Sequence, residues 1–193
     1  MCVVEVLSSC QSFSDNICEC KERVVMERES EKAKPHLIFA YGTLKRGFPN
    51  HYLMEELRSK DDAVLLGSYV TNEPYPLVCG PHGIPYLIKL PGSGHRVKGE
   101  VYAVSEEAVV VLDEFEGVSA GYYERLAVTA AEEEEGGGKV EAEAYWGHRR
   151  FGEVLWKMKG EVGLREYGEK EAREYVRKED RSGGRNTILD LVP

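Results

Sequence analysis

Between His36 and Trp146 the chain contains more strand-like segments than helical ones, and the two kinds do not alternate. Helical spacing of apolar residues predicts a helix over 50–57 and a second one from Ser105. Short apolar or alternating segments predict strands at residues 37–41, 63–69, 77–79, 85–90, 96–104, 123–129 and 140–146. Strict alternation would indicate a doubly wound parallel sheet. This order instead predicts an α+β fold with a mixed or barrel-like sheet.

The segments on either side of this region are more polar. Residues 1–34 end in a run dense in charge before Pro35, which predicts a flexible N-terminal tail outside the core. The folded domain is expected over 35–150. Residues 151–193 are predicted to form a polar C-terminal extension, with a surface helix over 168–180.

Charge and hydropathy narrow the classes of partner. The 193-residue chain carries a formal net charge of -9 and has no basic stripe, which disfavours nucleic acids and anionic membranes as partners. No apolar run approaches the ~18 residues of a membrane-spanning helix, and the N-terminus lacks the basic start of a secretion signal. We therefore expect a cytoplasmic protein that binds neither nucleic acid nor membrane. The oligomeric state is not predicted.

The five cysteines do not form a recognisable site. Four lie in the first twenty residues, where Cys18 and Cys20 could supply two zinc ligands, but no second pair follows at ligand spacing. Cys79 stands near His82, yet a buried apolar role is more frequent for such a cysteine than a nucleophilic one. We expect neither a metal nor a disulfide framework.

The segment HLIFAYGTLKRG, residues 36–47, is an apolar strand that stops at a Gly-Thr turn. Backbone N–H groups of Gly42, Thr43 and Leu44 would lack a partner in the sheet there, and such groups can hold a carboxylate or an oxyanion. A Gly-Thr turn is also a common way to end a strand. The turn by itself leaves both interpretations open.

The segment LDEFEG places Asp113, Glu114 and Glu116 at the end of the second predicted helix. A carboxylate there faces the negative end of the helix dipole, which tends to raise its pKa toward the value that a general base needs. Alternatively, all three are solvated and Gly117 only caps the helix. The residues alone do not decide between the two.

Several separated motifs together resemble the γ-glutamylcyclotransferase superfamily, and most of all γ-glutamylamine cyclotransferase and plant AIG2-like proteins. The motifs are YGTLKRG (41–47), PNH (49–51), EPYPLV (73–78), LPGSG (90–94), GEVYAV (99–104) and LDEFEG (112–117). The resemblance implies a small mixed β-barrel flanked by helices. It also implies an acyl-transfer reaction without a metal or organic cofactor, in which the α-amine of a γ-glutamyl amide attacks its own γ-carbonyl to give 5-oxoproline and a free amine or amino acid.

The resemblance also implies site residues. Tyr41, Gly42, Thr43 and Leu44 match the family's substrate loop, and Glu116 matches its catalytic glutamate, which would act as general acid and base. Tyr123 matches a tyrosine that follows this glutamate and is either a pocket hydroxyl or a packed strand residue. Lys45 and Arg46, next to the loop, are expected to face solvent at the rim of the pocket.

Two functions from different classes stay open at this point. The first is the cyclotransferase, acting on γ-glutamyl amines or on γ-glutamyl amino acids. The second is a non-catalytic binding or interaction protein of the same fold, in a stress or defence response. The intact Glu116 and Gly-Thr turn favour the enzyme.

Overall fold

The computed structural model describes residues 32–133, 137–181 and 188, and the described residues from Lys34 onward form one compact unit. The predicted tail over 1–34 lies almost wholly outside the described residues. The strands are β1 (His36–Ala40), β2 (Ala63–Thr71), β3 (Leu77–Cys79), β4 (Pro85–Leu87), β5 (Lys98–Val104), β6 (Tyr123–Glu132) and β7 (Lys139–Gly147). The helices are α2 (His51–Ser59), α3 (Glu106–Glu116), α4 (Arg149–Met158) and α5 (Glu169–Ala172), with short 3-10 turns η1 (Pro81–Gly83) and η2 (Lys178–Asp180).

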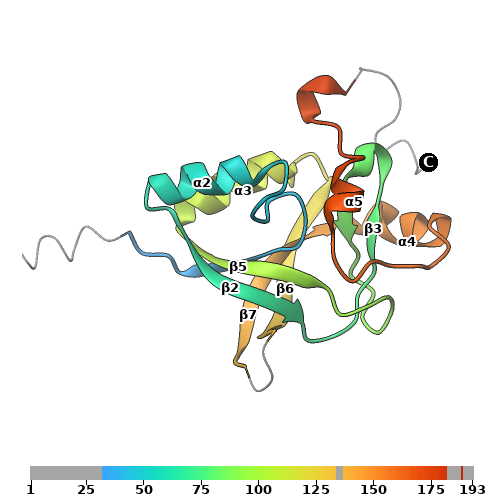
Figure 1. Cartoon of the computed structure of the whole chain (residues 1–193), viewed down its shortest axis with the longest axis horizontal. Helices are drawn as coiled ribbons and strands as arrows, with labels where there is room; N and C mark the ends of the chain where they lie inside the picture. Colours follow the sequence, from blue (N-terminus) through green and yellow to red (C-terminus); the bar gives the residue numbers. More distant parts are fainter. Residues whose placement is uncertain (1–31, 134–136, 182–187, 189–193) are drawn as a thin grey trace, which may run out of the picture. The chain divides into compact units, whose positions relative to one another are not determined.

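Strand β7 closes the sheet into a barrel. One edge of β7 pairs antiparallel with β6, and the other edge pairs in parallel with β1, where Ile38 faces Glu143. Because β1, β5, β2 and β6 follow one another in the sheet, the β1–β7 pairing completes a five-stranded mixed barrel. Farther along β7, Leu87 of β4 pairs in parallel with Trp146, so the β3–β4 hairpin extends from the barrel (Figure 1). The predicted α+β fold with a mixed barrel is confirmed.

Alternating side chains of the barrel strands enter two separate apolar clusters. One cluster fills the barrel and draws on all five strands, for example Phe39 of β1, Val101 of β5 and Ala144 of β7. The neighbouring strand residues Ile38 and Tyr102 belong to the other cluster, which also contains the apolar faces of α2 and α3. The period of two along each strand therefore separates the barrel interior from the layer beneath the helices.

Helix α3 is held at both ends by the residues that the sequence indicates. The Ser105 hydroxyl accepts a hydrogen bond from the Ala108 N–H at 3.2 Å and donates one to Asp62 at 2.5 Å. At the other end Gly117 has the left-handed conformation, with φ 68° and ψ 44°, and forms the predicted cap. Because both ends are fixed, the last residue of the helix, Glu116, has a defined position.

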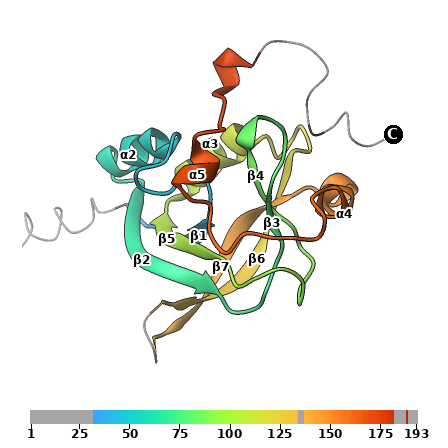
Figure 2. The ribbon, with the colours of Figure 1, turned by 45° about the vertical axis from the view of Figure 1, so that its right-hand side comes forward.

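The segment after residue 150 contributes to the core. Helix α4 crosses the predicted boundary at residue 150, and Phe151, Leu155 and Trp156 are buried in the cluster that also contains α2 and α3. Figure 2 shows α4 beside the β3–β4 hairpin. The helix predicted over 168–180 is a single turn, α5, followed by non-helical residues and η2. The rest of this segment is fixed by contacts such as the hydrogen bond from the Val176 N–H to the His82 carbonyl oxygen.

Within the described ranges, no helix is long and apolar enough to cross a membrane.

Replacing Phe151 with alanine should lower the free energy of unfolding by about 3–5 kcal/mol, because the ring is fully buried among core residues. The control is Val154→Ala on the exposed face of the same helix, which should change stability by no more than about 0.5 kcal/mol. Chemical denaturation of both variants measures the difference. A loss below about 1 kcal/mol for Phe151→Ala would show that α4 is not part of the cooperative core.

Candidate active site

A cavity of about 860 Å³ opens where β1 ends, next to the end of α3. Its volume lies in the upper part of the range of about 300–1,000 Å³ that is usual for pockets that bind small molecules. Four parts of the chain form its wall: the loop after β1, the segment from η1 into β4, the end of α3 with the turn that follows, and the C-terminal segment 175–181. Tyr123 of β6 and Tyr145 of β7 also line it, as do residues of β1, Tyr52 of α2 and Ile188.

The loop after β1 presents unpaired backbone donors to this cavity. Gly42, Thr43 and Leu44 all line it. Among the described residues, none of their three N–H groups donates a hydrogen bond. Such orphaned donors are rare in folded proteins unless water or a ligand satisfies them, so the loop has the chemistry to receive an anion or a carbonyl oxygen.

The loop is held in place from both sides. The Tyr41 hydroxyl donates to the Tyr145 carbonyl oxygen at 2.5 Å and accepts from the Leu87 N–H at 3.3 Å, so the loop start is bonded to β7 and β4. A side chain at Gly42 would collide with the ring of Pro85, because a Cβ there would lie 2.6 Å from its Cγ. Glycine is thus required for close packing against β4, rather than for a special backbone angle.

Glu116 lies in the cavity wall without a partner and, unlike Glu114 and Glu179 of the same wall, is not exposed to solvent over most of its surface. It lines the wall next to Gly117, and no hydrogen bond or ion pair from the described residues reaches it. The residue as a whole is half-buried, and the cavity that it lines accounts for its exposed part. Burial raises the pKa of Glu116 from 4.5 to about 8. Burial is therefore the cause of the rise, rather than the helix dipole that the sequence indicates.

The two neighbouring acids differ from Glu116. Asp113 accepts hydrogen bonds from Arg125 Nε at 2.9 Å and from the Tyr145 hydroxyl at 2.8 Å, so its charge is compensated. Glu114 also lines the cavity but is exposed to solvent. Of the three acids in LDEFEG, only Glu116 combines burial with an unpaired carboxylate, and the Gly117 cap coexists with it.

Four tyrosines surround the carboxylate and keep their protons. Burial is the main cause that raises the pKa of Tyr41, Tyr86, Tyr123 and Tyr145, and the charge of Glu116 adds to the rise in each case. Tyr123 lines the cavity, but its hydroxyl donates to the Pro85 carbonyl oxygen at 2.9 Å and its ring stacks on Tyr86. Tyr123 is thus a packed strand residue that also forms part of the wall. Tyr86 and Tyr145 were not singled out in the sequence, where nothing distinguishes them from other strand tyrosines.

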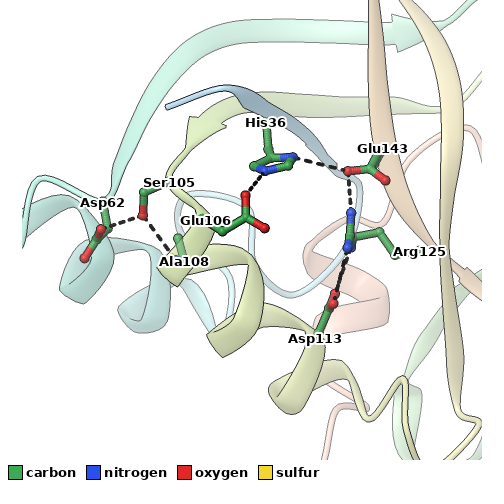
Figure 3. Close-up of polar contacts among 8 residues, drawn as sticks. All are labelled: His36, Asp62, Ser105, Glu106, Ala108, Asp113, Arg125 and Glu143. Carbon is green, nitrogen blue, oxygen red and sulfur yellow. Dashed lines mark hydrogen bonds and ion pairs between the residues drawn. The ribbon is translucent and has the colours of Figure 1, made fainter. Parts of the chain in front are cut away.

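A chain of charged groups fixes α3 against the barrel, as Figure 3 shows. Arg125 of β6 lies between Asp113 of α3 and Glu143 of β7 and pairs with both. His36 of β1 contacts Glu143 at 3.9 Å and Glu106 at the start of α3 at 2.5 Å. Because these groups hold α3 at its start and near its end, they determine where Glu116 meets the loop after β1.

The prediction that Lys45 and Arg46 both face solvent is wrong for Lys45. Its side chain is buried, and Nζ donates to Glu166 Oε1 and to the Tyr167 carbonyl oxygen, each at 3.0 Å. Arg46 is exposed, and its Nε donates to the buried Glu100 at 2.8 Å. Lys45 therefore joins the loop to the C-terminal part of the chain rather than lying at a solvated rim.

The cysteine and metal interpretations find no support in the described ranges. Burial raises the pKa of the Cys79 thiol to about 11, so the thiol stays protonated at neutral pH and is a poor nucleophile. No cluster of three or more potential metal ligands occurs among the described residues. Cys18 and Cys20 lie outside these residues.

The sequence is similar to known proteins of one family. The family model described as "Gamma-glutamyl cyclotransferase, AIG2-like" matches residues 38–162. An Arabidopsis thaliana protein named "Putative gamma-glutamylcyclotransferase" is 47% identical over 132 residues, which are 63% of this chain and 71% of that protein. Human γ-glutamylaminecyclotransferase is 51% identical over 87 residues, 45% of this chain and 56% of the human protein, so the match spans little more than half of that relative.

A solved structure shows the same fold over nearly its whole length. The crystal structure of an AIG2-like protein from Mus musculus superposes with a TM-score of 0.62 at 36% sequence identity. The match covers 76% of this chain and 98% of the mouse chain. The family match, the barrel and the motifs agree, and this chain belongs to the γ-glutamyl cyclotransferase, AIG2-like family.

Proposed function

We propose that this chain is a γ-glutamylcyclotransferase that releases 5-oxoproline from a γ-glutamyl amide, with Glu116 as general acid and base. The family and its named relatives support an enzyme of this type. The observation that carries the proposal is a buried, unpaired carboxylate in the same cavity as three unpaired backbone N–H groups. One group can move protons, and the other can stabilise negative charge.

The first step needs a neutral amine. The amine at a peptide N-terminus has a pKa of about 7.7–8.0, and the free α-carboxylate beside the amine of a γ-glutamyl compound raises its pKa further, so this amine is protonated at neutral pH. The pKa of Glu116, at about 8, lies much nearer to that of the ammonium than the ordinary value of 4.5 does, so transfer of a proton from the ammonium to the carboxylate is far less unfavourable than it would be to an ordinary glutamate. A glutamate with the ordinary pKa of 4.5 would hold this proton far less well.

The freed amine then attacks the γ-carbonyl carbon of the same molecule. A C–N bond forms, and the electron pair of the carbonyl moves to its oxygen, which the N–H groups of Gly42, Thr43 and Leu44 stabilise. The cavity's main task is to hold the chain in the folded-back conformation that closes a five-membered ring, and such orientation can supply several kcal/mol.

Collapse of the tetrahedral intermediate restores the carbonyl and breaks the bond to the leaving nitrogen. Overall, the attacking nitrogen loses two protons and the leaving nitrogen gains two. Glu116 passes them from one to the other and ends in its starting state, so a single carboxylate serves both halves of the reaction.

A non-catalytic binding protein of the same fold is the second candidate. Such a protein would have no need of a carboxylate that is kept buried without a partner, because that arrangement lowers the stability of the fold.

We also propose a small-molecule γ-glutamyl substrate as the main partner. A cytoplasmic location and the absence of a nucleic-acid partner stay predictions from the composition.

Glu116→Gln should keep the fold but abolish 5-oxoproline release from γ-glutamyl compounds. We expect the rate of release to fall at least about 100-fold, which is the contribution of a typical general base. Glu153→Gln is the matched control, because Glu153 is exposed on α4 and does not line the cavity. We expect the control to retain most of the activity. Chromatographic assay of 5-oxoproline measures both, and a Glu116→Gln variant with near-normal turnover would remove this residue as the base.

The raised pKa of Glu116 should also make the free energy of unfolding depend on pH. Below pH 4.5 the carboxyl group is protonated in both the folded and the unfolded chain. As the pH rises from 4.5 to about 8, the unfolded chain releases the proton and the folded chain keeps it, so the free energy of unfolding falls. Above pH 8 the group is ionised in both states and the loss is complete.

Glu116→Gln removes this ionisation. Relative to wild type, the variant should therefore gain stability between pH 5 and pH 9, by up to a few kcal/mol. Urea unfolding of both proteins at pH 5 and at pH 9 gives the difference between their free energies of unfolding. A stability difference that does not change with pH would mean that Glu116 has an ordinary pKa.

A further inference from the structure

The C-terminal segment adds charged groups to the cavity wall. Residues Tyr175, Arg177, Lys178, Glu179 and Arg181 all line the cavity, although they lie beyond the family match, which ends at residue 162. The cavity wall therefore combines the loop and the helix end of the proposed reaction site with a segment that lies beyond the family match. Its volume leaves room for more than a γ-glutamyl unit.

Arg181 is the half-buried cation of this segment, and two contacts fix its orientation. Its Nε donates to the Val176 carbonyl oxygen at 3.0 Å, and one terminal nitrogen donates to the Tyr175 hydroxyl at 3.2 Å. The guanidinium carbon also lies 5.6 Å from the centre of the Tyr175 ring. Both partners belong to its own segment, so the guanidinium is preorganised and not free to extend into solvent.

In the part of the chain that the structure describes, no carboxylate compensates the Arg181 charge. Among the described residues, no Asp or Glu lies within ion-pair distance of it, and its second terminal nitrogen has no acceptor. Two exposed arginines elsewhere are paired, Arg149 with Glu124 and Arg46 with Glu100, whereas Arg177, which also lines the cavity, is exposed and has no ion pair among the described residues. A fixed guanidinium with free donors in a cavity wall is suited to accept a carboxylate from a ligand.

Arg181 is connected to the proposed reaction site by hydrogen bonds. The Tyr175 hydroxyl accepts from Arg181 and also from Asn50 Nδ2, at 2.8 Å. The same Asn50 nitrogen donates to the Thr43 hydroxyl at 2.9 Å, which lies in the loop that presents the unpaired N–H groups. The charge of Arg181 also acts on Tyr86, where it opposes the rise in pKa that burial causes. Arg181 and the loop thus belong to one wall, with Tyr175 and Asn50 between them.

The two ends of this wall suit different parts of a substrate. The backbone N–H groups of the loop, together with Glu116, take the γ-glutamyl unit in the proposed reaction. Arg181 is separated from the loop by Tyr175 and Asn50 and is therefore available to the group on the other side of the scissile bond, the leaving amine. The chain as a whole carries a net charge of -9 and repels anions, so a local cation decides whether an anionic leaving group is accepted.

We propose, on the basis of the cyclotransferase function proposed above, that Arg181 is a specificity-determining residue that binds a carboxylate on the leaving amine. The preferred substrates are then γ-glutamyl amides of amino acids, whether joined through an α-amine or a side-chain amine, over γ-glutamyl amides of neutral amines.

The test uses pairs of substrates that differ only in this carboxylate. γ-Glutamyl-alanine is compared with γ-glutamyl-alaninamide, and γ-glutamyl-ε-lysine with its lysinamide counterpart, so that two positions of the carboxylate are covered. The full-length wild type, Arg181→Gln, Arg181→Lys and the control Arg173→Gln are assayed for 5-oxoproline release. Arg173 is exposed in the same segment and does not line the cavity.

For Arg181→Gln we expect kcat/KM to fall about 10- to 100-fold for the acid of at least one pair, the scale of a charged hydrogen bond, and less than about 2-fold for its amide. Arg181→Lys should keep part of the preference for the acid, and Arg173→Gln all of it. The ratio of acid to amide is the decisive readout, because a general loss of folding or of loop position lowers both substrates together.

Three results would overturn the proposal. An equal loss for acid and amide would place Arg181 at the glutamyl carboxylate or in a positioning role. Unchanged kinetics for both would remove it from the site. A wild-type protein that prefers the substrates with an amide in place of this carboxylate would show that no cation binds the carboxylate of the leaving amine. Absence of 5-oxoproline release by wild type from all four compounds is a different failure, because it would refute the proposed function itself.

Discussion

The burial of one unpaired carboxylate, that of Glu116, is the constraint on which the site depends. Such a group is unfavourable in a protein interior, because nothing replaces the water that it loses. The carboxyl group responds by keeping its proton up to a pH of about 8, which is the property that proton transfer to and from an amine requires. The burial that lowers the stability of the fold is thus the same feature that the proposed chemistry uses. The rest of the structure holds Glu116 in this position.

The barrel provides that support by bringing together distant parts of the chain. Pairing of β7 with both β1 and β4 places the loop after β1 next to Pro85 and Tyr145. Arg125 and its carboxylate partners then fix α3 against β6 and β7, so that the helix ends at the same cavity. An acid on a helix end and donors on a strand end can act on one ligand only because these pairings hold both at one place.

Local sequence signals predicted much of this fold but not the environment of its charged groups. Ser105 and Gly117 mark the ends of α3 because capping depends on residues close in sequence, and the alternation in the strands reflects burial on one face. Lys45 was misplaced because its partners, Glu166 and the Tyr167 carbonyl oxygen, are more than 120 residues away. The core role of Phe151 was missed for a similar reason, since one short apolar face within a polar stretch gives a weak signal.

In the candidate site, too, local sequence predicted the position of residues but not their environment. The acids of LDEFEG could be located from the sequence, yet their local pattern is equally consistent with a solvated helix end. Only the tertiary structure separates Asp113, which is compensated by Arg125, from Glu116, which is not. Similarly, the packing of Gly42 on Pro85 and the position of Arg181 in the cavity wall depend on long-range contacts that no local pattern encodes.

The central claim is that the Glu116 carboxyl group titrates near neutral pH because it is buried without a partner. The most direct measurement is an NMR titration of the protein labelled with 13C at the glutamate side-chain carboxyl carbons. Comparison with Glu116→Gln identifies the resonance. The account predicts a titration midpoint close to pH 8 for this carboxyl group, whereas a midpoint near 4.5 would show a solvated glutamate and contradict it.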